Sequence, residues 1–305
     1  MTDTPIPGRL RFIDIQGSRR AVLEWGEPGA PIVLLQHGMR DHAHSWDWVG
    51  AHLSDHYHVF APDMRGHGDS DWMRDGNYGL PQYVLDLAQI VDTLSSEPIK
   101  IVGHSLGGHI VLRYAASFPE RVESQLLIEC IELPLVRDER ASPTPYPQRV
   151  RKWIGDEAKR QTVSKRYYPD LQTAQERMAA ANPGIDAATV AHLTRYGVIQ
   201  DPVHGYRWKY DLACRLRPPE DQSGTGLDQI LDAVACPTLL AYGDDSWIPR
   251  PPAERLARLR QHRLVRFADA SHWLHHQRRE AFCALVDTFL ADPVGTITNE
   301  RLVHA

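Results

Sequence analysis

The chain has 305 residues, of which 42% are hydrophobic and 24% are charged, as is typical of a folded globular protein rather than a disordered one. Lys and Arg number 34 against 39 Asp and Glu, so the formal net charge is −5. This charge excludes a dominant basic surface and argues against nucleic acid as a partner. The length suffices for one large α/β domain with an inserted segment.

The ends and the cysteines favour a cytoplasmic protein. The first five residues contain neither a basic segment nor an apolar one, so we expect no secretory signal. No apolar run approaches the length that spans a bilayer, so we expect no membrane contact. The four cysteines are far apart and form no C-x-x-C pair, which favours reduced, buried thiols.

The first half of the chain alternates strands and helices. Helical spacing is clearest over residues 80–94, which carry Leu80, Val84, Leu87, Val91 and Leu94. Repeated alternation predicts a mostly parallel sheet covered by helices on both faces. The expected strands are residues 9–15, 20–26, 31–36, 57–61, 99–102 and 125–130, and the expected helices are residues 45–53, 80–94 and 106–117.

The alternation stops between about residues 133 and 232. Prolines 143, 145 and 147 open this segment, a basic stretch (149–166) follows, and aromatic residues are scattered through the rest. We predict a mainly helical insertion, or cap, in which the basic stretch is a solvated helix face. The core domain then comprises residues 1–132 and 233–305, with strands at 237–243 and 263–267, helices at 252–259 and 276–291, and a tail from residue 292.

The most informative motif is Gly103-His104-Ser105-Leu106-Gly107, which follows an expected strand and opens an expected helix. A sharp turn here would force the side chains two residues before and after the serine to collide, and glycine at both positions removes that collision. The serine oxygen would then stand at a helix N-terminus, where developing negative charge is favoured. This arrangement is a nucleophile elbow.

Together with three further motifs, the elbow resembles the α/β-hydrolase superfamily. His37-Gly38 follows the third strand, residues 63–70 match a D-x-R-G-x-G-x-S loop after the fourth, and Ala270-Ser271-His272-Trp273 follows the last. Ser271 departs from the glycine usual in the family. The resemblance implies an α/β-hydrolase fold, with a mostly parallel central sheet, helices on both faces and an inserted, mainly helical cap.

The resemblance also implies a catalytic arrangement. Ser105 would be the nucleophile and His272 its base, in the family's chain order. The backbone amides of Met39 and Leu106 would form the oxyanion hole. His275 and His276 are rival bases, but we expect them to begin the last helix. The side chain of His104 is expected to point away from that of Ser105.

The acid that orients the histidine is ambiguous. The family usually takes it from G-x-x-D-x-x-x-P after the seventh strand, and this chain reads Gly243-Asp244-Asp245-Ser246-Trp247-Ile248-Pro249. Counting back from the proline selects Asp245, whereas counting forward from the glycine selects Ser246, which has no carboxylate. We prefer Asp245. Glu129, at the end of the sixth strand, is the main alternative because some family branches take their acid from there, and Asp244 is a further one.

Other candidate residues concern the substrate. Arg40, Trp208 and Tyr210 are candidate substrate-binding residues. For Arg40 the alternative is an ion pair with Asp41, and for the aromatic residues it is packing within the cap. The spacings among the histidines at 37, 42, 44, 52, 56 and 58 fit no common zinc signature, so we expect neither a metal nor another cofactor.

Serine at the elbow favours acyl transfer, because the resembling epoxide hydrolases and haloalkane dehalogenases carry aspartate there. We expect hydrolysis of small to medium carboxylic esters, aromatic and lactone substrates included, through an acyl-enzyme on Ser105. A carbon–carbon bond hydrolase or a cofactor-free perhydrolase is the alternative. A non-catalytic ligand-binding protein is an alternative of another class. The expected partner is a small-molecule ester, and the expected assembly is a monomer or homodimer.

Overall fold

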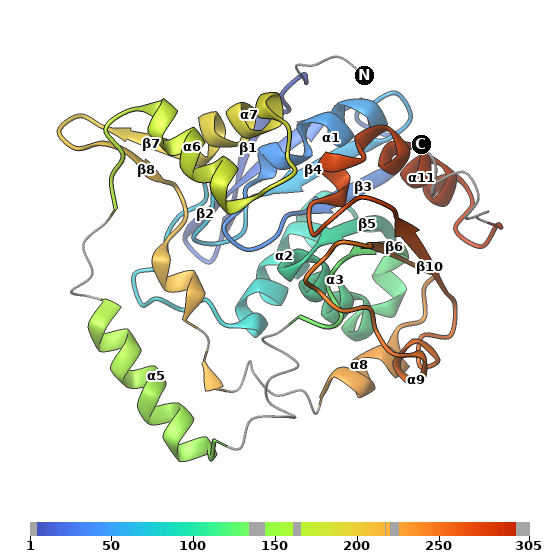
Figure 1. Cartoon of the computed structure of the whole chain (residues 1–305). Coiled ribbons are helices and arrows are strands. Elements are labelled where there is room, and N and C mark those ends of the chain that lie inside the picture. The colour runs from blue at the N-terminus through green and yellow to red at the C-terminus, as the bar shows by residue number, and fades with distance from the viewer. Residues whose placement is uncertain (1–4, 134–143, 161–165, 217, 220–225, 297–305) are drawn as a thin grey trace.

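An eight-stranded sheet forms the centre of the computed structural model, which describes residues 5–133, 144–160, 166–216, 218–219 and 226–296 (Figure 1). The strands follow the order β1-β2-β4-β3-β5-β6-β9-β10 across the sheet. They are β1 (Arg9–Ile15), β2 (Ser18–Trp25), β3 (Ile32–Gln36), β4 (His58–Pro62), β5 (Ile99–His104), β6 (Val122–Ile128), β9 (Thr238–Gly243) and β10 (His262–Phe267).

Only the β1 edge of this sheet is antiparallel. β1 pairs with β2 and β2 with β4 in antiparallel fashion, whereas the five pairs from β4 to β10 are parallel. The carboxyl ends of the parallel strands therefore meet at one edge, where ligands of open α/β sheets bind. This is the mostly parallel sheet predicted from the sequence.

Helices cover both faces of the sheet because successive strand residues point to opposite sides. Leu34 and Leu240 face a core that includes residues of α2 (Leu80–Leu94), α3 (Leu106–Ser117) and α8 (Leu227–Ala233). Leu35 and Leu239 face the second core, which includes residues of α1 (Asp47–Leu53), α10 (Leu274–Gln277) and α11 (Arg279–Ala291). The near-continuous apolar strands of the sequence thus reflect burial on both faces.

Most predicted elements lie within a few residues of the observed ones, and α2 and α3 have the predicted bounds. The differences concern helix ends. The helix expected at 45–53 begins as the 3-10 turn η1 (Ala43–Trp46), and the one expected at 276–291 is broken into α10 and α11 at Arg278. The helix expected at 252–259 is shorter in the structure, where α9 covers Ala253–Leu256. A further short 3-10 turn, η2 (Pro119–Arg121), lies between α3 and β6.

The segment between β6 and β9 contains α5 (Tyr146–Arg160), α6 (Leu171–Ala181), α7 (Ala187–Gly197), β7 (Val198–Asp201), β8 (Gly205–Trp208) and η3 (Leu212–Arg215), followed by α8. No residue of α5 is buried, as expected of a solvated basic helix. The rest of that basic stretch, 161–165, lies outside the described residues, as do Pro143 and the end of the tail.

Two details refine the predicted insertion. β7 and β8 form an antiparallel hairpin among the helices. The predicted boundary at residue 232 falls inside α8, whose Leu227 and Leu231 belong to the same core as α3. We therefore refer to residues 144–216 as the inserted segment. All four cysteines are buried and free, and no helix in the described part of the chain is long and apolar enough to cross a membrane.

Candidate active site

Ser105 occupies a strained turn between β5 and α3. Its φ of 54° and ψ of −122° are values that non-glycine residues rarely adopt. Its amide donates to the carbonyl of Ile128 at the end of β6, which ties the turn to the sheet (2.8 Å). A Cβ on Gly103 would lie 2.7 Å from the Cα of Gly108, and one on Gly107 would lie 2.3 Å from the carbonyl oxygen of His37. Glycine is therefore required at both elbow positions, although each glycine makes room for a different backbone neighbour rather than for the other elbow position.

The loop after β3 lies directly beside this serine. A Cβ built on Gly38 would be 3.2 Å from the Cβ of Ser105. His37 Nδ1 donates to the Gly38 carbonyl (2.7 Å), and its Nε2 accepts from the Met64 amide (3.0 Å). Burial and the neighbouring His67 lower the pKa of His37 well below its usual range, so this imidazole is neutral and holds the loop in place.

Two backbone amides are suitably located for an oxyanion hole. Leu106 is the first residue of α3, where a helix amide has no partner within the helix. Met39 follows Gly38 in the loop beside Ser105. The geometry is compatible with the roles expected for Met39 and Leu106, which remain predictions.

The D-x-R-G-x-G-x-S loop acts as a scaffold for these parts. The Asp63 carboxylate accepts from the amides of Ala43 (2.7 Å) and Asp69 (2.8 Å), and so joins the loop after β3 to the loop after β4. Arg65 forms two hydrogen bonds to the buried carboxylate of Asp86 on α2 (2.8 and 2.6 Å). The motif thus fixes backbone position rather than supplying reacting groups.

A buried carboxylate faces His272. Glu129 Oε2 lies 3.4 Å from His272 Nδ1, and the Glu129 side chain is fully buried. Its other oxygen, Oε1, accepts from the Gly243 amide (2.6 Å), whereas the Ser246 hydroxyl donates to Oε2, the oxygen that faces His272. Glu129 has a φ of 52° at the residue that follows β6, a strained conformation that turns the chain at the strand end.

The preference for Asp245 does not match this geometry. Asp245 is exposed, and its backbone amide donates a hydrogen bond to the Ala270 carbonyl (2.9 Å). Asp244 pairs instead with Arg266 (2.7 Å) on β10. In the family pattern G-x-x-D-x-x-x-P, the aspartate stands three residues after the glycine, and in this chain that position is Ser246. The Ser246 hydroxyl donates to Glu129. The structure therefore replaces Asp245 with Glu129 as the carboxylate beside the imidazole.

The other histidines near the site are neutral packing residues. His104 Nε2 lies 2.8 Å from the His272 carbonyl oxygen, so its ring supports the histidine loop. Burial, with the nearby imidazoles, lowers the pKa values of His104, His275 and His276 well below the usual range. His275 stacks on Trp46 at 5.0 Å, and both rival histidines lie in α10, close to the predicted helix start.

A cavity of about 280 Å³ adjoins the site. Its lining includes Met39 and Arg40 from the loop beside Ser105, and Trp273, which follows His272. Trp208 and Tyr210 also line it, and their role in substrate binding stays a prediction. Tyr196 is not among the lining residues and stacks on His44, with ring centroids 3.8 Å apart. The wall opposite the core comes from the inserted segment.

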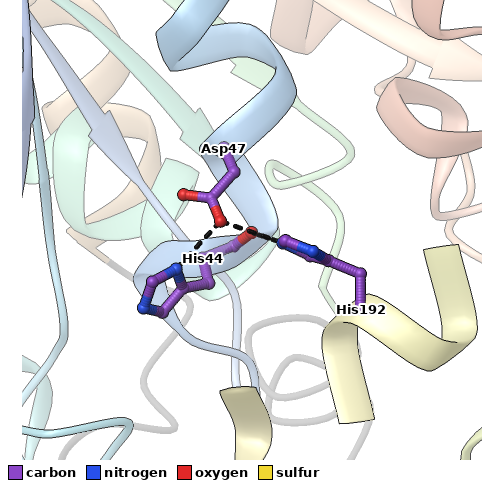
Figure 2. Close-up of side chains that lie close together, drawn as sticks. All are labelled: His44, Asp47 and His192. Carbon is purple, nitrogen blue, oxygen red and sulfur yellow. Dashed lines mark hydrogen bonds and ion pairs between the residues drawn. The ribbon is translucent and has the colours of Figure 1, made fainter. Parts of the chain in front are cut away.

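A second histidine cluster joins the inserted segment to the core. Figure 2 shows His44 and His192 turned toward one carboxylate oxygen of Asp47, with His44 Nδ1 and His192 Nε2 each 2.9 Å from it. The nitrogen and oxygen atoms that these three residues could offer to a metal ion lie within 4.8 Å of one another. Burial alone would raise the pKa of Asp47, but the hydrogen bonds from His192 and His44 outweigh it and lower the pKa. Both imidazoles bond to one oxygen of this carboxylate, Oδ2, and we refer to His44, Asp47 and His192 as the clamp. The other oxygen, Oδ1, is buried and has no hydrogen-bond partner among the described residues.

Comparison with known proteins defines the family. A family model described as the alpha/beta hydrolase fold matches residues 31–278. The protein is a member of the α/β-hydrolase fold family. This confirms the fold class and the resemblance inferred from the sequence motifs.

Several relatives of this α/β hydrolase are themselves hydrolases. A 2-hydroxy-6-oxo-2,4-heptadienoate hydrolase of Pseudomonas putida is 29% identical over 272 residues, covering 86% of this chain and 90% of the relative. The solved structure of an esterase of Mycobacterium tuberculosis is 26% identical, covers 94% of this chain and 93% of that one, and superposes with a TM-score of 0.75. These similarities support hydrolase activity without specifying the bond cleaved.

The first curated relatives match a smaller region. An uncharacterised protein of Mycobacterium tuberculosis is 37% identical over 122 residues, which span 40% of this chain and 35% of the relative. This α/β hydrolase therefore aligns with about a third of the length of those relatives.

Proposed function

We propose that this α/β hydrolase is a serine hydrolase that cleaves carboxylic esters through an acyl-enzyme on Ser105. The observation that carries the proposal is the buried Glu129 carboxylate beside His272 Nδ1, at the same sheet edge as the serine elbow. A serine, a histidine and a buried acid at the ends of three different strands form the set of groups that acyl transfer requires.

In the proposed reaction, Glu129 holds the His272 imidazole with its proton on Nδ1, which leaves Nε2 as the base. Nε2 accepts the proton of Ser105 as the serine oxygen attacks the ester carbonyl. The amides of Met39 and Leu106 stabilise the resulting oxyanion. The imidazolium then protonates the departing alcohol, which leaves the acyl group on Ser105. In the second half of the reaction, His272 accepts a proton from a water molecule as that water attacks the acyl-enzyme, and the carboxylic acid and free Ser105 are released.

The inserted segment supports a cap role in this proposal. It contributes Tyr168, Trp208 and Tyr210 to the cavity wall across from Met39 and Trp273. A cavity of about 280 Å³ fits small to medium substrates rather than polymers.

The test is turnover of 4-nitrophenyl esters of graded acyl length by the wild type and Ser105→Ala. We expect hydrolysis that saturates with substrate and falls by at least about 1,000-fold in the variant. Activity retained by Ser105→Ala would exclude the serine mechanism. Turnover of a vinylogous diketone acid with none of any ester would favour carbon–carbon bond cleavage, the second candidate suggested by the Pseudomonas relative.

A further inference from the structure

The cavity beside the proposed site is rich in arginine. Among its 18 lining residues, five are arginines and one is an aspartate, Asp41. The chain as a whole has more acidic than basic residues, with a net charge of −5, so this concentration runs against the bulk charge. The five are Arg40, Arg166, Arg177, Arg207 and Arg215.

These guanidinium groups are available to a ligand. Within the described residues, none of the five forms an ion pair, whereas other arginines such as Arg65 and Arg258 pair with carboxylates. Lys209, which precedes Tyr210 of the lining, is neutralised by Asp69 at 2.7 Å. Guanidinium groups that gather around one cavity, with no carboxylate partner in the described part of the chain, attract an anion.

The aromatic walls hold two of these arginines without neutralising them. Arg207 lies over the Trp72 ring (5.0 Å to its centroid), and Arg166 lies over the Tyr168 ring (5.5 Å). Arg207 also donates to the Trp208 carbonyl at 3.4 Å. Stacking restricts where the guanidinium lies but leaves its charge and most of its donors free.

Asp41 contributes little opposing charge. Its carboxylate is buried and accepts a hydrogen bond from the His42 amide (2.8 Å), so it faces the loop rather than an arginine. Burial raises the pKa of Asp41 to about 7, so a substantial fraction is uncharged near neutral pH.

Apart from Asn182, the rest of the lining is aromatic or aliphatic. Trp208 and Tyr210 are nearly parallel, with ring centroids 6.3 Å apart, and Met178 and Ile185 also contribute. Such a wall suits an apolar substrate body, while the guanidinium groups suit a charged end.

We propose that the substrate of this hydrolase is an anionic ester, with an apolar body and a carboxylate or similar oxyanion at the end remote from the scissile bond. This inference rests on the proposed ester hydrolysis. The catalytic groups contact the ester, and the arginines of the cavity bind the anionic end. The substrate class is therefore set by the inserted segment, which supplies four of the five arginines.

The experiment compares matched pairs of esters. One pair carries the charge on the acyl side (4-nitrophenyl hydrogen glutarate and its methyl-capped ester), and the other carries it on the alcohol side (the butyrate ester of 4-hydroxybenzoate and that of its methyl ester). We expect kcat/KM for the charged member of at least one pair to exceed that of its capped partner by about 10-fold or more, the size expected for a hydrogen-bonded ion pair. The pair that responds identifies the side that carries the anion.

Two further measurements tie the preference to the cavity. Arg207→Gln and Arg215→Gln should each reduce the charged-to-capped ratio by about 10-fold. Arg258→Gln, the control, should leave the ratio unchanged, because Arg258 pairs with Asp228 and Asp232 and does not line the cavity. Circular dichroism checks that the variants are folded. In the wild type, the ratio should fall as NaCl rises from 0.05 to 1 M, because salt screens exposed charges.

The outcomes separate the two proposals. Ser105-dependent turnover of the capped esters with no preference for either charged ester would overturn the anionic substrate and leave ester hydrolysis standing. A preference that persists equally in the Arg207, Arg215 and Arg258 variants would also overturn it. No Ser105-dependent turnover of any ester would contradict the proposed function itself.

Discussion

At the scale of single residues, the site depends on which carboxylate contacts His272. Glu129 is fully buried and 3.4 Å from Nδ1, whereas Asp245 is exposed. Glu129→Gln should lower kcat by about 1,000- to 10,000-fold, because an amide holds the wrong tautomer of the imidazole. Asp245→Asn, the matched control, should stay within about 2-fold of the wild type, since an exposed side chain away from the imidazole contributes little. Steady-state hydrolysis of a 4-nitrophenyl ester measures both, and the reverse ranking would restore Asp245.

The strained backbone of Ser105 makes a second prediction at this scale. Its φ of 54° suits glycine better than any residue with a Cβ. Ser105→Gly should therefore be more stable than Ser105→Ala by about 1 kcal/mol, although both lack the nucleophile. Urea unfolding followed by tryptophan fluorescence measures the difference. Equal stabilities would show that the elbow stores little strain.

The residue scale also shows where sequence reasoning stops. The elbow, the His37-Gly38 loop and His272 are recognisable because each follows a strand and has a motif of its own. The acid has no comparable motif, and motif counting favoured Asp245. The informative signal is Ser246, the third residue after Gly243. A serine at the position of the family's aspartate indicates that the acid comes from another strand end, and in the structure Ser246 donates to that acid, Glu129. Sequence spacing alone does not show which of two strand ends supplies the carboxylate.

At the scale of elements, α7 is fastened to the core by polar contacts. His192 on α7 bonds to Asp47 on α1, and the His42 ring bonds to the Leu193 carbonyl (2.9 Å). Arg279 on α11 reaches the Thr189 hydroxyl at the start of α7 (2.6 Å). Since α7 precedes the hairpin that carries Arg207 and Trp208, these contacts position part of the cavity wall.

Removing the negative charge of Asp47 should destabilise the folded protein. Asp47→Asn should lower the free energy of unfolding at pH 7 by about 1 to 3 kcal/mol, because two partly buried imidazoles lose a charged, buried acceptor. Asp287→Asn removes a half-exposed carboxylate that also pairs with a histidine, His52, and should cost at most about 1 kcal/mol. Chemical denaturation compares the two, and equal losses would contradict a special role for the buried cluster.

The clamp also has a predicted pH dependence. The pKa of Asp47 is lowered in the folded protein from its model-compound value of 3.8. A depressed pKa means that the stabilisation is present above about pH 3.8 and is lost as the pH falls through the folded value. The stability gap between wild type and Asp47→Asn should therefore narrow as the pH falls below about 4. A gap that narrows instead as the pH rises would contradict this assignment.

A metal-removal experiment distinguishes the clamp from a metal site. Because Asp47 satisfies both imidazoles by hydrogen bonds, EDTA should leave the thermal midpoint of the purified protein unchanged. A midpoint that falls with EDTA and returns with Zn²⁺, but does neither in His192→Ala, would show that an ion holds the three residues together.

At the scale of the whole molecule, hydrophobic patterning predicted the sheet and its covering helices well, because burial on both faces leaves a strong local signal. The arrangement of the inserted segment was not predictable in the same way. The docking of α7 depends on contacts between residues more than 100 positions apart, such as His192 with Asp47. The arginine-lined cavity follows from that docking, so it was visible in the structure and not in the composition.

The account rests on Ser105 as an activated nucleophile, and reaction with a serine-directed fluorophosphonate tests this most directly. Intact-protein mass spectrometry should show one adduct per chain in the wild type, mapped to Ser105 by peptide analysis. Ser105→Ala should form no adduct, and His272→Ala should react at least about 100-fold more slowly because the serine loses its base. A wild-type protein that never labels, or an adduct that persists in Ser105→Ala, would contradict the account.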